Sequence, residues 1–155
     1  MTREESIKQS QEKYRQVRER NKQEIQKRKE GVAYIHENKI DCFIMVINYY
    51  DVCVAHKWDG DDLCFSMCFK SPKDEFSARI AKGLLGNAMK YETRDRFVRI
   101  PLKDEKKYLK KQKGIRQFIC GSIICNAMVN DMMPECIRRD VLYSESCVPG
   151  VIREL

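Results

Sequence analysis

The sequence has no apolar run long enough to cross a membrane. The longest, residues 118–129, is interrupted by Gly121, Ser122 and Asn126 and falls well short of roughly 20 residues. Residues 1–5 include acidic side chains and lack the apolar core of a secretory signal. With 43% hydrophobic and 34% charged residues and a mean hydropathy of -0.59, we expect a soluble globular protein of the cytoplasm with one core.

Histidine is scarce, which limits the catalytic chemistry that the chain can support. His36 and His56 are the only imidazoles. A strand-end histidine such as His56, even beside Cys53 or Cys64, is more often structural than catalytic. The phosphate-cradling patterns Gly-x4-Gly-Lys-Ser/Thr and Gly-x-Gly-x-x-Gly are both missing. The sequence therefore predicts that the protein is not an enzyme.

Cysteine is abundant, but its spacing does not favour a metal site. The eight cysteines occur without an export signal, so we expect reduced thiols. Cys64 and Cys68 fall in an expected strand, and Cys120 and Cys125 in an expected helix, whereas zinc knuckles lie in turns. The nearby aspartates are explained by turn chemistry and lack the glutamate of a calcium loop: Asp59, Asp61 and Asp62. We predict neither a metal nor a cofactor.

The positive charge is concentrated in two blocks. Residues 1–32 carry ten Lys or Arg against six Asp or Glu, and residues 86–116 carry eleven against four, within a net charge of +7. Such blocks suit an anionic partner such as a nucleotide, a nucleic acid or phosphate, and they also occur on solvated helix faces. The sequence leaves both interpretations open.

Residues 2–30 lack proline and glycine and are rich in helix formers, which predicts a long helix ended by Gly31. We therefore divide the chain into a charged helical arm, residues 1–31, and a single α+β domain, residues 32–155. The arm has a narrow apolar stripe, which favours contact with a partner subunit and hence a homo-oligomer: Ile7, Tyr14, Val17 and Ile25.

The domain is expected to be built on a hairpin. Residues 42–56 predict one strand and residues 63–69 its partner, with Asp59 and Gly60 at the centre of the turn. That register pairs His56 with Leu63. It places an apolar face, with residues 50, 52 and 54, opposite a smaller mixed face that carries cysteines.

The remaining elements complete an α+β fold. A helix is expected to begin at Ser71 with Pro72 in its first turn, and residues 96–100 predict an edge strand ended by Pro101. Residues 103–113 predict a polar helix and residues 115–133 a mostly buried one. We therefore expect a long N-terminal helix, a small, mainly antiparallel sheet and packed C-terminal helices.

The candidate binding residues surround the helix expected after Ser71. A helix N-terminus suits a phosphate, arginines suit phosphates or bases, and aromatic rings can stack on bases. The candidate ligand-binding residues are Phe69, Lys73, Asp74, Arg79, Tyr91, Arg94, Arg96 and Arg99. Phe69 is also a candidate core residue on the apolar face.

Residues 68–83 carry the one resemblance in the chain. The stretch Cys68-Phe-Lys-Ser-Pro-Lys-Asp-Glu-Phe-Ser-Ala-Arg-Ile-Ala-Lys-Gly83 resembles small phage-encoded proteins, among them the Thoeris anti-defence family, which sequesters cyclic ADP-ribose isomers. The resemblance implies a non-catalytic homo-oligomer in the host cytoplasm. It also implies that a cyclic nucleotide is captured by aromatic and arginine side chains near subunit contacts.

Three functions follow as hypotheses. The first is a phage-type protein that sequesters a small phosphorylated, cyclic nucleotide and so counters host defence. The second is a nucleic-acid-binding protein that uses the arm and residues 86–116. The third is an inhibitor of a host enzyme that docks through the arm.

Overall fold

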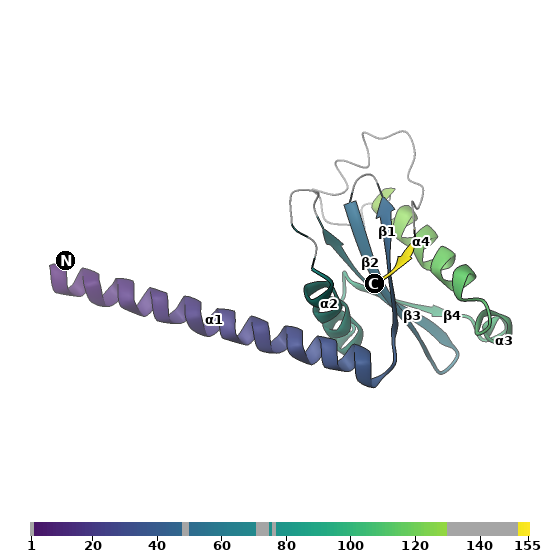
Figure 1. Ribbon diagram of the computed structural model, residues 1–155, viewed down its shortest axis with the longest axis horizontal. Helices are drawn as coiled ribbons and strands as arrows, with labels where there is room; N and C mark the ends of the chain where they lie inside the picture. The colour runs from purple at the N-terminus through teal and green to yellow at the C-terminus, as the bar shows by residue number, and fades with distance from the viewer. Residues whose placement is uncertain (1, 48–49, 71–74, 76, 130–151) are drawn as a thin grey trace.

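The fold is a five-stranded antiparallel sheet with helices on both faces. The computed structural model describes residues 2–47, 50–70, 75, 77–129 and 152–155. The sheet has the strand order β4-β3-β2-β1-β5. The elements are α1 (Arg3–Glu37), β1 (Asp41–Ile47), β2 (Tyr50–Asp59), β3 (Asp62–Lys70), α2 (Ala78–Tyr91), β4 (Phe97–Pro101), α3 (Lys106–Leu109), α4 (Lys113–Val129) and β5 (Arg153–Glu154). The expected α+β class is confirmed (Figure 1).

Alternating side chains of β2 and β3 divide the core into two layers. Val52, Val54 and Phe65 pack with α4 on one face. Cys53 and Ala55, the intervening residues, pack with α1 and α2 on the other face. The prediction of one apolar and one small, cysteine-bearing face is therefore confirmed, because successive side chains of a strand point to opposite faces.

The strand expected over residues 42–56 is two strands. β1 and β2 form an antiparallel hairpin in which Ile47 pairs with Tyr50. Residues 42–56 contain no glycine or proline that would indicate a turn, so the sequence of β-branched and aromatic residues predicted one continuous strand.

The β2–β3 turn also differs from its predicted register. Asp59 pairs with Asp62, so Gly60 and Asp61 are the two turn residues, and His56 pairs with Phe65 rather than Leu63. Gly60 has a φ of 58°, in the left-handed region that glycine enters without steric cost. This shift of two residues leaves every side chain on its predicted face.

Gly31 lies inside α1 rather than at its end. The helix continues to Glu37, and Gly31 is buried where α1 crosses α2. A Cβ atom on Gly31 would overlap the carbonyl group of Gly83, and one on Gly86 would overlap that of Gly31. Asn87 Nδ2 donates to the Lys27 carbonyl oxygen at 2.9 Å across the same crossing. Glycine at Gly31 therefore permits close backbone approach and does not end the helix.

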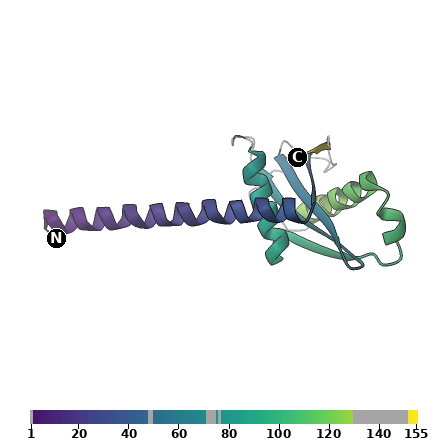
Figure 2. The same cartoon turned by 60° about the horizontal axis from the view of Figure 1, so that its bottom comes forward.

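The N-terminal part of α1 projects away from the sheet. Figures 1 and 2 both show this arm extending well beyond the other elements, with the N-terminus at its far end. Ile7, Tyr14 and Val17 on the arm are exposed.

The second helix begins later than predicted. α2 starts at Ala78, and the Ser77 side chain caps it by accepting from the Ile80 N–H at 3.3 Å. Ser71 and Pro72, the expected start, lie outside the described residues. A serine precedes each of the two possible starts, and the local pattern alone favoured the one followed by proline.

The C-terminal elements follow the predicted order with different bounds. β4 is the predicted edge strand, α3 spans four residues of the expected polar helix, and α4 corresponds to the apolar helix up to Val129. β5 was not predicted, because two residues carry no periodic signal; it pairs with β1. Among the described residues, no helix combines the length and apolarity needed to span a bilayer.

The Gly86→Ala substitution is expected to destabilise the fold. The added methyl group meets backbone that cannot move without separating α1 from α2, so we expect a loss of about 3 kcal/mol in the free energy of unfolding. Gly114→Ala in α4 is the matched control, because the new Cβ has no described atom within 4 Å apart from its chain neighbours and its own helix backbone. Urea denaturation of both variants measures the difference. Equal stabilities would show that the helices do not cross on this glycine contact.

Candidate functional site

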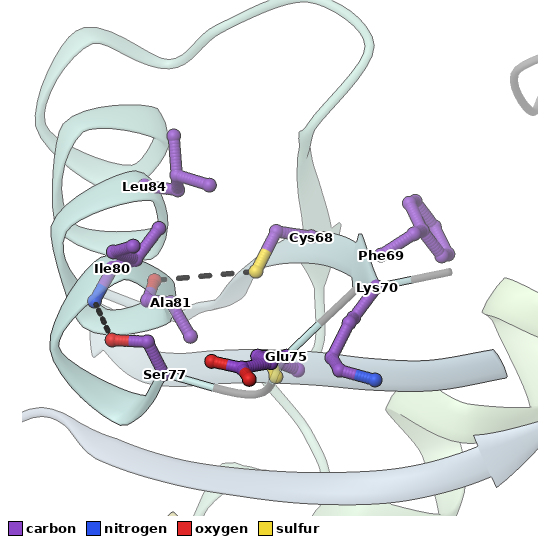
Figure 3. A pocket seen from close by; sticks show the side chains of 9 residues that line it. Cys68, Phe69, Lys70, Glu75, Ser77, Ile80, Ala81 and Leu84 are labelled. Carbon is purple, nitrogen blue, oxygen red and sulfur yellow. Dashed lines mark hydrogen bonds between the residues drawn. The ribbon is translucent and has the colours of Figure 1, made fainter. Parts of the chain in front are cut away.

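A groove lies between the end of β3 and the start of α2, with a volume of about 250 Å³. We call it the thiol groove, because Cys53 and Cys68 are among its lining residues. Figure 3 shows Cys68 in this lining. Ile80, Ala81 and Leu84 of α2 supply an apolar wall. The described residues that line it are Cys53, Cys68, Phe69, Lys70, Glu75, Ser77, Ile80, Ala81 and Leu84.

A second groove, of about 360 Å³, lies between α1 and α2. We call it the basic groove, because three of the five described residues that line it are cationic: Arg28, Lys29 and Arg79, together with Ile25 and Ile80. Ile80 lines both grooves, so the apolar wall of the thiol groove adjoins the basic groove at this side chain.

The cations of the basic groove are only partly neutralised. Arg28 Nη2 lies 3.6 Å from a carboxylate oxygen of Glu24, while Arg79 and Lys29 form no ion pair with any other described residue. Both side chains are exposed. An anion that enters the groove would therefore meet positive charge that the described part of the chain does not neutralise.

The structure brings only part of the predicted site together. Arg79 lines the basic groove and Phe69 borders the thiol groove. The Phe69 ring also packs against the core on the α4 face and points away from Ser77 and Ala81 in Figure 3. Lys73 and Asp74 lie outside the described residues.

The other four candidates lie elsewhere. Tyr91 ends α2, about 18 Å along the helix from Arg79 at 1.5 Å per residue. It is exposed, with the Lys90 ammonium 5.3 Å from its ring centre. Arg94 and Arg96 follow in the exposed connection to β4. These residues do not share a groove with Arg79.

Arg99 forms ion pairs with three carboxylates of its own chain. Its guanidinium lies 2.9 Å from Asp59, 3.1 Å from Asp62 and 2.6 Å from Glu92. Hydrogen bonds to Glu92 and then to the two aspartates raise the pKa of Arg99 further. A group surrounded by three carboxylates is poorly suited to bind a phosphate.

Other cations of the second basic block are also paired internally. Lys106 lies 3.8 Å from Asp61, and Lys113 lies 3.1 Å from Glu154. Arg116 is buried and donates to the Leu109 carbonyl oxygen at 2.6 Å. With Arg99, four of the eleven cations in residues 86–116 therefore have partners within the fold, which weakens this block as a phosphate-tracking surface.

Sequence reasoning missed Arg28 and Lys29. With a helix that ends at Gly31, both residues belong to a detached arm, whereas the continuing helix sets them against α2. Glycines at 83 and 86, which are three residues and so about one helical turn apart, are the signal that could have indicated a close helix crossing.

His56 is not placed to activate a thiol. It is 3% exposed and packs edge-on against Phe43 on the α4 face, whereas Cys53 and Cys64 belong to the other layer of the core. Its Nε2 has no hydrogen-bond partner among the described residues. Burial lowers the pKa of His56 to about 4, with Asp41 acting in the opposite direction.

The buried imidazole predicts a loss of stability in mild acid. Unfolding frees His56 to bind a proton at its ordinary pKa of 6.5. Its contribution is therefore complete above pH 6.5 and is lost as the pH falls toward 4. Between pH 7 and pH 5 we expect the free energy of unfolding to fall by about 2 kcal/mol more in the native protein than in His56→Phe. Parallel losses in urea titrations at the two pH values would contradict this role.

Comparisons with known proteins give no indication of the function, so the proposal below depends on the geometry of the grooves. No protein-family model matches the chain, and searches of curated proteins and of solved structures found no similar protein.

Proposed function

We propose that the protein binds and sequesters a small phosphorylated nucleotide across the basic and thiol grooves. The observation that supports this most is that Ile80 lines both grooves, so that a cationic surface adjoins an apolar one. A nucleotide has the matching character, since its phosphates are anionic and its base has apolar faces. The resemblance of residues 68–83 to Thoeris anti-defence proteins favours a cyclic nucleotide signal of host defence.

In this arrangement the phosphates contact Arg28, Lys29 and Arg79. Arginine can bind phosphate through two parallel hydrogen bonds, which gives geometric selectivity as well as charge attraction. The base packs against Ile80 and Leu84. The basic groove has a volume of about 360 Å³, which lies within the roughly 300–1,000 Å³ of small-molecule sites. The thiol groove, of about 250 Å³, is smaller and would hold only part of the nucleotide.

We propose binding without catalysis. The thiol and basic grooves are lined by no imidazole, and no cluster of three metal-binding side chains occurs among the described residues. Burial of His56 on the opposite face of the sheet also separates it from the groove thiols.

We further propose that the arm contacts a second copy of the chain. Ile7, Tyr14 and Val17 are 48%, 65% and 49% exposed on a helix that projects from the sheet (Figure 2). A projecting helix without tertiary contacts gains little stability from its own backbone, and packing an apolar stripe would supply it. A monomeric mass in solution would contradict this part of the proposal.

The Arg79→Ala substitution is expected to abolish or strongly weaken nucleotide binding. Loss of a charged hydrogen-bond donor costs about 1.5–3 kcal/mol, which corresponds to a dissociation constant roughly 10–100 times higher. Isothermal titration of the native protein and the variant with AMP, ADP-ribose and cyclic ADP-ribose measures the change.

Arg20→Ala is the control, because it removes the same charge from the exposed arm outside both grooves. It should leave nucleotide affinity unchanged. If neither the native protein nor the control binds any of the three nucleotides, the proposal fails. Equal weakening of both variants toward single-stranded DNA, with a steep dependence on salt, would favour the nucleic-acid function instead.

A further inference from the structure

Two cysteines lie directly opposite each other in the sheet. Cys53 of β2 and Cys68 of β3 are partners in the antiparallel register. Both side chains point to the α2 face and line the thiol groove. Figure 3 shows the Cys68 sulfur directed toward the start of α2, 4.0 Å from the Ala81 carbonyl oxygen.

This pairing suits a disulfide. Directly opposed residues of antiparallel strands have Cα atoms about 4.5–5.5 Å apart. Disulfides span Cα separations of about 4.4–6.8 Å. The two sulfurs can therefore bond without a change in strand register.

The other cysteines of the sheet lack this arrangement. Cys42 is opposite Ala55, and Cys64 is opposite Lys57 in β2 and Arg99 in β4. Neither faces another cysteine across a strand pair.

We propose that Cys53 and Cys68 form a redox-active dithiol that a peroxide oxidises to a cross-strand disulfide. The Cys53 thiolate attacks one peroxide oxygen, the O–O bond breaks, and hydroxide leaves, so that Cys53 becomes a sulfenic acid. The Cys68 sulfur then attacks the Cys53 sulfur. The S–S bond forms, the S–O bond breaks, and the leaving hydroxide takes the Cys68 proton as water. Overall, two thiols and hydrogen peroxide give one disulfide and two waters.

The pKa values of the two thiols are shifted in the directions that favour Cys53 as the thiol that reacts first with the peroxide. When Cys53 is ionised, Cys68 donates a hydrogen bond to it, which lowers the pKa of Cys53 against the opposing effect of burial. The same hydrogen bond, followed by burial, raises the pKa of Cys68. Burial raises the pKa of Cys42 and of Cys120 to about 12, so these remain protonated and less reactive.

The test is peroxide treatment of the full chain, alkylation of the remaining thiols and mass spectrometry of tryptic peptides. Residues 40–57 and 58–70 are separate tryptic peptides that each contain two cysteines. We expect a cross-linked pair of these peptides whose fragment ions place the bond between Cys53 and Cys68, and its loss on reduction.

Variants assign the link independently. Cys53→Ser and Cys68→Ser should abolish it, whereas the matched controls Cys42→Ser and Cys64→Ser should retain it. If the serine variants fail to fold, fragment ions from the native protein still decide the pairing. No cross-link in the folded native protein, or one that involves Cys42 or Cys64, would overturn the proposal. Because this test uses no nucleotide, its outcome is separate from that of the proposed function.

Discussion

The close crossing of α1 over α2 determines where the candidate site lies. Backbone meets backbone at Gly31, Gly83 and Gly86, with no room for a Cβ atom at any of them. This contact keeps α1 helical past Gly31 and sets its basic residues beside the start of α2. The basic groove is a consequence of the crossing, because one wall comes from each helix.

The sheet supplies the thiol groove, because alternate side chains of its strands point toward α2. The buried side chains of β2 and β3 that face α2 are small: Cys53, Ala55, Cys64, Ser66 and Cys68. The helix can therefore approach closely enough for Ser66 Oγ to donate to the Leu85 carbonyl oxygen at 2.9 Å. Where α2 begins, this layer opens into the thiol groove. The same small residues therefore permit helix packing and place two buried thiols in the lining of the groove.

Features that follow from a periodic pattern of apolar residues could be predicted from the sequence. Features that depend on contacts between distant parts of the chain could not. The faces of β2 and β3 were predicted correctly despite a register error, since a shift of two residues preserves them. Gly31 was interpreted as a helix end because isolated glycine commonly marks one, whereas its observed role depends on a helix far along the sequence. For the same reason Arg79 was predicted as a site residue, while Arg28 and Lys29 were not.

Nucleotide binding by the two grooves is tested most directly by native mass spectrometry of the purified protein after incubation with an acid-soluble nucleotide extract. We expect a discrete oligomer that retains a stoichiometric, phosphorylated small molecule, and we expect this molecule to be lost when Arg28 and Arg79 are both replaced by glutamate. Identical spectra for the native and charge-reversed proteins would show instead that the grooves have no part in ligand binding.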